Sequence, residues 1–180
     1  MGATQSSIGL LTPDEISELK IISGNVFNDR EIIHLYKRFT TLDKDSMNLI
    51  TRDTLMKIPE LAYNPLAPRI IDTLDPYNTG ISMDIFVQTL AVMSPKASSA
   101  AKIQFIFDVF DSDGDDLIKI SDFNEILKLL LGKKISEEKI SEISEKSMKK
   151  ISEKNEINLK DFKNFLIEND FDPFNFKIEF

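Results

Sequence analysis

The chain has 180 residues, 42% of them hydrophobic, which is enough to bury the core of one large domain or two small ones. A net charge of −8 argues against a nucleic-acid partner, and the absence of cysteine excludes disulfides, thiol catalysis and cysteine-bound zinc. No apolar run approaches the about 18 residues of a membrane span, and no secretory signal opens the chain, so a cytoplasmic protein is expected.

The apolar spacing predicts helices along the first half of the chain. Residues 12–15 and 28–31 have the sequence of helix starts, in which a capping side chain precedes a glutamate. The second of these helices carries one apolar stripe, formed by Ile32, Leu35, Tyr36 and Phe39. A loop and a short apolar helix ending near Pro59 follow, and then a second helix–loop–helix unit. Residues 94–100 are the best candidate for a linker.

The pattern repeats after this linker. Apolar stripes lie on both sides of an acidic loop, Gly132 can end the second helix, and Ser136 can begin the next. A last short helix covers residues 157–166. The predicted fold is therefore all-α, with four helix–loop–helix units in two pairs. The expected domains are an N-terminal pair over residues 1–93, a C-terminal pair over residues 101–170 and a hydrophobic tail over residues 171–180.

The acidic loop has the spacing of an EF-hand cation site. Such a loop supplies oxygens at positions 1, 3, 5, 7, 9 and 12 and an apolar residue at position 8. Counted from Asp111, the oxygen positions that could bind the ion are Asp111, Asp113, Asp115, the Leu117 carbonyl and Asp122, and Ile118 is the apolar residue. Clustered carboxylates repel each other unless a cation neutralises them, so the loop predicts one site for calcium or magnesium.

Three departures from the pattern affect this prediction. Position 6 normally holds a glycine with a left-handed backbone, but here it is Asp116, and the glycine stands at Gly114. Asp122 replaces the usual glutamate at position 12, and its shorter side chain favours fewer ligands, a geometry that suits magnesium. Lys119 at position 9 adds a positive charge. A solvated acidic turn without metal is the alternative interpretation.

The other three loops have lost the residues that bind a cation. The loop from Asp43 to Thr54 has Met47 at position 5, and the loop around residues 75–85 is one residue short and nearly free of carboxylates. The fourth loop places Lys150 and Lys154 at ligand positions if Ile157 takes position 8. We expect these loops to fold as scaffolding without metal.

Three segments carry a family resemblance, namely residues 35–44 (LYKRFTTLDK), 58–70 (IPELAYNPLAPRI) and 170–180 (DFDPFNFKIEF). They resemble the calcium- and integrin-binding proteins, and the first two also resemble the calcineurin B homologous proteins. The ending and Asp122 favour the former family. The resemblance covers nearly the whole chain and implies four EF-hands, the first two free of metal. Members usually bind a cation in the third and fourth, and the fourth departs from this pattern at Lys150 and Lys154.

Both ends of the chain suggest interactions. MGATQS fits the N-myristoylation pattern, with Gly2 as the acylated residue, although a plain polar terminus is the alternative. One acyl chain gives only reversible membrane binding, so cycling between cytoplasm and membrane is expected. The apolar residues of the tail can cover a partner-binding groove until a partner displaces them, or they can pack permanently in the core.

These observations favour a non-enzymatic adaptor that binds an amphipathic helix of a partner protein at a membrane. The alternatives are a regulatory subunit of a protein phosphatase, as in calcineurin B, and a transporter cofactor similar to the calcineurin B homologous proteins. An enzyme is not expected, because the chain has no phosphate-binding glycine loop, no cysteine and one isolated histidine.

Overall fold

The computed structural model describes residues 11–152 and 154–172. The helices and strands in this part of the chain are α1 (Pro13–Ile22), α2 (Asp29–Leu42), α3 (Arg52–Leu55), α4 (Pro59–Ala62), α5 (Ala67–Leu74), α6 (Met83–Met93), α7 (Ser99–Phe110), β1 (Ile118–Lys119), α8 (Ile120–Leu131), η1 (Gly132–Lys134), α9 (Glu137–Ile151), β2 (Glu156–Ile157) and α10 (Leu159–Glu168). The four units are α2–α3, α5–α6, α7–α8 and α9–α10. The predicted all-α class with four helix–loop–helix units in two pairs is confirmed.

The helix ends lie where the capping residues predict them. Thr12 and Glu15 form a capping box at the start of α1, and Asn28 and Glu31 form another at the start of α2. Each box satisfies backbone N–H groups that have no partner within the helix. Gly132, with φ of 62°, ends α8, since glycine adopts a left-handed backbone without strain.

The loops of each pair are joined by a short antiparallel contact between isoleucines. Ile50 and Ile81 exchange two backbone hydrogen bonds of 2.9 Å. Ile118 in β1 pairs with Ile157 in β2, and all four isoleucine side chains are buried. Position 8 is apolar because this side chain points into the core beneath its loop pair. The contact thereby fixes the two loops of a pair against each other.

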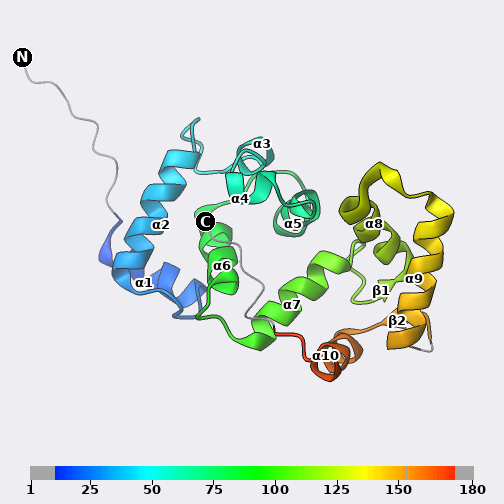
Figure 1. Ribbon diagram of the computed structural model, residues 1–180. Coiled ribbons are helices and arrows are strands. Elements are labelled where there is room, and N and C mark those ends of the chain that lie inside the picture. The colour runs from blue at the N-terminus through cyan, green and yellow to red at the C-terminus, as the bar shows by residue number, and fades with distance from the viewer. Residues whose placement is uncertain (1–10, 153, 173–180) are drawn as a thin grey trace, which may run out of the picture.

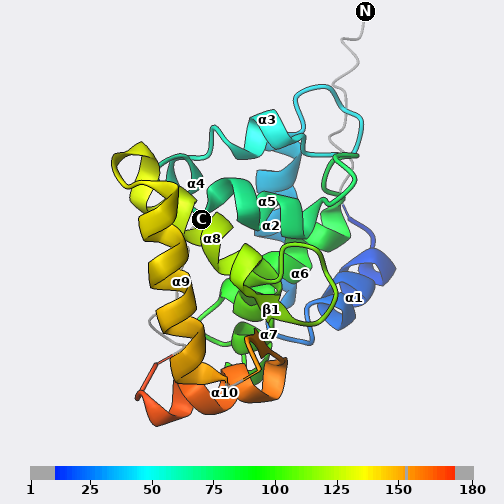
Figure 2. The ribbon, with the colours of Figure 1, turned by 90° about the vertical axis from the view of Figure 1, so that its right-hand side faces the viewer.

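The buried side chains form two main clusters, and α7 contributes to both of them. Phe105 and Val109 belong to the cluster under the first two units, whereas Ile103, Ile106 and Phe107 belong to the cluster under the last two. Figure 1 accordingly shows α7 running between a group with α1, α2 and α6 and a group with α8, α9 and α10. In Figure 2, α9 stands beside α8, and α10 lies across its lower end.

A second connection between the halves comes from the side chain of Arg69 on α5. Its guanidinium donates hydrogen bonds to three backbone carbonyls at the end of α7: Asp108 at 3.2 Å, Val109 at 2.9 Å and Asp111 at 2.6 Å. The carbonyls of Asp108 and Val109 belong to the last turn of α7, and that of Asp111 follows it. Acceptors at a helix end have no partner within the helix, and the dipole favours a cation there. The Arg69 contact therefore holds the start of the acidic loop against the second unit.

None of the helices within residues 11–152 and 154–172 is both long enough and apolar enough to cross a lipid bilayer.

Candidate metal centre and partner groove

Three carboxylates of the acidic loop converge on one point. Asp111, Asp113 and Asp115 each offer an oxygen, and these oxygens lie within 4.8 Å of one another. Asp111 ends α7 and is buried, whereas Asp113 and Asp115 are exposed. The alternate spacing brings the three side chains to the same side of the turn, as the sequence predicts.

Asp111 also organises the backbone of the loop. One carboxylate oxygen accepts the N–H groups of Gly114 at 2.9 Å and Asp115 at 3.3 Å, and the other accepts that of Asp116 at 2.9 Å. Burial raises the pKa of Asp111, although these backbone donors act in the opposite direction. A buried carboxylate with neighbours of like charge is a position at which a cation would relieve unfavourable electrostatic energy.

Lys119 supplies a positive charge to the exposed side of this cluster. Its ammonium Nζ lies 3.2 Å from Oδ2 of Asp113 and also forms an ion pair with Asp115. Hydrogen bonding to Lys119 lowers the pKa of Asp113, and the two carboxylates raise the pKa of Lys119. Position 9 of the loop therefore places an ammonium beside two of the three converging carboxylates.

Asp122, predicted as the ligand at position 12, has different partners in the structure. Its two oxygens accept the N–H groups of Lys119 at 2.7 Å and Ser112 at 3.3 Å, together with the Ser112 hydroxyl. Asp122 is buried and lies outside the group of three converging carboxylates. These hydrogen bonds tie the first residues of the loop to the start of α8. The spacing of the acidic residues did not indicate this contact between Asp122 and Ser112.

Two residues of the acidic loop have a left-handed backbone, one at the displaced glycine and one at position 6. Gly114 has φ of 70° and Asp116 has φ of 64°. Position 6 therefore keeps the left-handed turn expected of an EF-hand loop, with an aspartate in place of the glycine. Leu117 follows, and its N–H donates to Oδ1 of Asp115 at 3.1 Å.

The donor set suits a hard divalent cation. Calcium and magnesium prefer carboxylate and carbonyl oxygens, and calcium–oxygen distances of about 2.3–2.6 Å are compatible with oxygens within 4.8 Å of one another. Asp111, Asp113 and Asp115 would provide three of these oxygens. The ammonium of Lys119 is the feature that does not suit a cation, and an ion would have to separate it from its two carboxylates.

The first and second loops retain the organising aspartate without the rest of the ligands. Asp43 accepts N–H groups four and five residues further along, at 3.0 and 2.8 Å. Asp75 accepts two in the same way, both at 2.8 Å. Ile50 is the seventh residue after Asp43, whereas its partner Ile81 is the sixth after Asp75. The second loop is therefore one residue shorter than the first, as predicted. In these loops a carboxylate holds the turn through backbone hydrogen bonds.

The fourth loop has Ile157 at position 8, paired with Ile118, as in one of the predicted alignments, and α9 runs into the first positions of this loop. The helix continues to Ile151, so Lys150 at position 1 lies in its last turn. Asn155, with φ of 57°, takes the left-handed place of position 6 before β2. Between the helices lie residues 152–158, compared with residues 111–119 in the third loop. The shorter segment carries Lys154 and no carboxylate cluster among its described residues.

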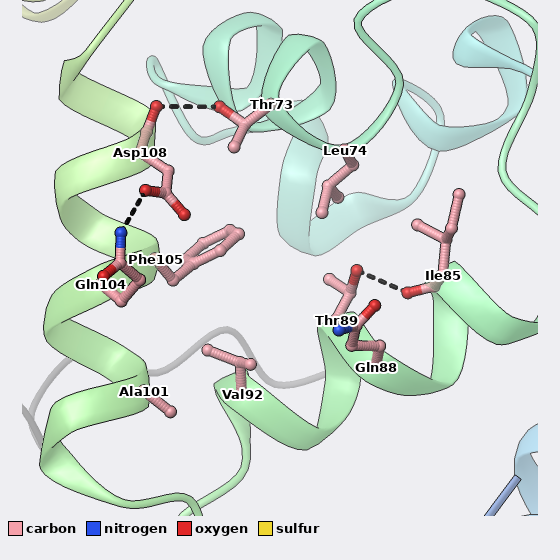
Figure 3. A pocket seen from close by; sticks show the side chains of 10 residues that line it. All are labelled: Thr73, Leu74, Ile85, Gln88, Thr89, Val92, Ala101, Gln104, Phe105 and Asp108. Atoms are coloured by element: carbon pink, nitrogen blue, oxygen red, sulfur yellow. Dashed lines mark hydrogen bonds between the residues drawn. The ribbon is translucent and has the colours of Figure 1, made fainter. Parts of the chain in front are cut away.

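Several hollows lie among the described residues. An apolar cavity of about 510 Å³ in the C-terminal half lies between α7, α8, α9 and α10. It is lined by Ile106, Phe110, Phe123, Ser147, Lys150, Ile151, Phe162, Phe165, Leu166 and Phe171. A second hollow of about 400 Å³ is lined by residues of α5, α6 and α7. Figure 3 shows its mixed walls, in which Gln104 donates to the Asp108 carboxylate beside the ring of Phe105.

The remaining predicted features fall at the chain ends. Gly2 and residues 173–180 of the tail lie outside the described residues. Phe171 is described; it lines the apolar cavity and is 41% exposed.

The fold and the acidic loop define this chain as a member of the EF-hand superfamily. It is 36% identical over 149 residues to the calcineurin B protein of Naegleria gruberi, and the match covers 82% of this chain and 81% of that protein. It is 37% identical over 149 residues to calcineurin B type 2 of Dictyostelium discoideum (82% and 79%) and 32% identical over 140 residues to the type 1 protein of that organism (77% and 77%). No family model matches the chain. The chain belongs to the calcineurin B family.

These relatives support the broader sequence-based expectation of an EF-hand protein close to calcineurin B. The finer assignment to the calcium- and integrin-binding proteins stays a prediction. Calcineurin B proteins are non-catalytic regulatory subunits, which confirms the expectation that the chain is not an enzyme.

Proposed function

We propose that the chain is a calcineurin B-like regulatory protein that binds an amphipathic helix of a phosphatase partner. The apolar cavity of about 510 Å³ is the observation that carries this proposal. An amphipathic helix buries its apolar face in such a groove through anchors spaced three and four residues apart. The similarity to calcineurin B proteins supplies the class of partner.

The walls of the cavity suit this role. Phe110 packs against Phe123 and Phe162, with ring centroids 5.8 and 6.0 Å apart. Aromatic walls provide large apolar surfaces, and Lys150 at the rim offers a positive charge to an acidic residue on the partner. The groove thus combines an apolar floor with a polar edge, as helix-binding grooves do.

We further propose that the third loop holds one calcium or magnesium ion. Asp111, Asp113 and Asp115 would bind it, with the Leu117 carbonyl completing the set. Asp122 at position 12 is a further proposed ligand, although it lies outside the group of three converging carboxylates. The ion would neutralise the clustered carboxylates and thereby stabilise the loop that joins α7 to α8, two walls of the groove.

Helix binding is tested by calorimetric titration with a synthetic peptide of the calcineurin B-binding helix of a calcineurin catalytic subunit. Ser147→Asp places a carboxylate on the cavity wall and should weaken binding at least about tenfold, because the charge would be desolvated by the peptide. Ser141→Asp makes the same change elsewhere on α9, at a residue that does not line the cavity, and should leave the affinity unchanged. Equal affinities for the two variants would refute the cavity as the binding groove.

The cation proposal is tested by titrating the purified protein with calcium and then with magnesium. One binding event, abolished by Asp111→Asn, is expected. Absence of binding in the wild-type protein would show that all four loops act as scaffolding.

The adaptor role expected from the calcium- and integrin-binding proteins would use the same groove for a different helix. Proteins that co-purify with the chain distinguish a phosphatase from a membrane protein or transporter. We also propose the division into residues 1–93 and 101–170 and acylation of Gly2 with reversible membrane association. Mass spectrometry of the chain co-expressed with an N-myristoyltransferase tests the acylation.

A further inference from the structure

The feature that the EF-hand pattern does not explain is the lysine at position 9. That position commonly contributes an oxygen, often through a water molecule, to the bound ion. Lys119 instead directs its ammonium at the carboxylates of positions 3 and 5, with 3.2 Å between its Nζ and Oδ2 of Asp113. An ammonium has three N–H donors and no acceptor, so it can bind these carboxylates but cannot bind a metal ion.

We propose that Lys119 is a tethered counter-ion of the third loop: it neutralises the carboxylates in the absence of a divalent ion and competes with that ion for Asp113 and Asp115. The proposal rests on the proposed cation site and explains how this chain regulates it. Both ion pairs come from residues of the same turn, so no other segment of the protein has to move for the exchange.

The backbone around Lys119 makes this arrangement specific. Lys119 lies in β1, where its neighbour Ile118 pairs with Ile157, and its own N–H donates to Asp122 at 2.7 Å. The backbone of Lys119 is therefore held at both sides, while its side chain is only partly exposed. A fixed backbone limits the entropy lost when the ammonium settles between the two carboxylates.

The magnitude follows from the two ion pairs. Exposed pairs of this kind stabilise a protein weakly, and the lysine also repels a nearby divalent ion. Replacing Lys119 by glutamine removes both effects and should tighten calcium binding roughly tenfold, within a range of about three- to thirtyfold. In chelator, the same change should lower the melting temperature by about 2–4 °C, because the carboxylates lose their counter-ion.

The experiment compares Lys119→Gln with Lys128→Gln. Lys128 lies on α8 and forms an ion pair of 3.0 Å with Glu137, so its replacement removes the same charge and one ion pair away from the loop. Calcium titration and thermal unfolding in chelator are measured for the wild-type protein and both variants. The proposal expects tighter binding and a lower melting temperature in chelator for Lys119→Gln alone.

The possible outcomes separate this proposal from the cation site itself. Binding in all three proteins with equal or weaker affinity in Lys119→Gln would overturn the competition while leaving the cation site intact. No binding in any protein would refute the cation site. The counter-ion role would then be decided by the melting temperatures in chelator, and equal values for the two glutamine variants would overturn it.

Discussion

The Arg69 contact makes a prediction about the stability of the whole molecule. Arg69→Ala removes three hydrogen bonds, of 2.6, 2.9 and 3.2 Å, between α5 and the end of α7. The carbonyls that lose their donor stand at the start of the acidic loop. The change therefore affects the connection between the two halves without altering either apolar cluster.

Each of the three bonds is expected to stabilise the folded protein by about 1 kcal/mol net, since water replaces part of each lost bond. The positive charge at the end of α7 adds about 0.3–1 kcal/mol through the helix dipole. Because Arg69 is only partly buried, we expect a total loss of about 2–4 kcal/mol. For a protein of 180 residues this corresponds to a melting temperature lower by about 5–15 °C.

The assay is equilibrium unfolding in urea, followed by circular dichroism in the presence of chelator. Arg30→Ala is the matched control, because Arg30 is exposed on α2 and its replacement should change the free energy of unfolding by less than about 0.5 kcal/mol. Arg69→Lys keeps the charge but loses the planar group that reaches several carbonyls, and it should lose about half of the stabilisation.

The reasoning fails if Arg69→Ala unfolds at the same urea concentration as Arg30→Ala, since the three bonds would then add nothing beyond hydration. Full stability in Arg69→Lys would show that charge alone is sufficient and that the guanidinium geometry is irrelevant.

Three further predictions concern the core, the pH dependence and the tail. Ile118→Ala should lower the free energy of unfolding by about 2–5 kcal/mol, measured in urea, because the side chain is fully buried beneath the loop pair, whereas Ile167→Ala, at an exposed residue, should have little effect. Lys139 and Lys146 lower the pKa of Glu142 from 4.5 to about 2, so its contribution to stability is complete above pH 4.5 and is lost as the pH falls towards 2. The melting temperatures of wild type and Glu142→Gln should therefore converge over that interval, and a constant difference would contradict the assignment. Deletion of residues 171–180 should tighten binding of the partner helix if the tail covers the groove, and calorimetry showing unchanged or weaker affinity would refute displacement.

Much of the fold can be predicted from the sequence, because its signals are local. The capping boxes at Thr12 and Asn28 depend on residues three apart, and both form as expected. The place of Ile118 follows from counting along the acidic loop, and it does pair with Ile157. Local spacing also brings the oxygens of the first three acidic ligand positions together.

The roles of other residues could not be predicted, because they depend on distant partners or on a choice among several nearby ones. Arg69 contacts the carbonyl of Val109, a residue 40 positions away, and nothing in its local sequence indicates this. Asp122 has the spacing of a ligand, yet its oxygens accept hydrogen bonds from Ser112 and Lys119.

The sequence by itself determined the four helical units, the register of their loops and which loop keeps its carboxylates, since these follow from spacing along one chain. Only the tertiary structure decided that Arg69 ties the acidic turn to the other half. It also decided that four helices line one apolar groove. The physical reason is that a charged or aromatic side chain has several possible partners along the chain. The packing of the helices determines which of these partners lies within contact distance.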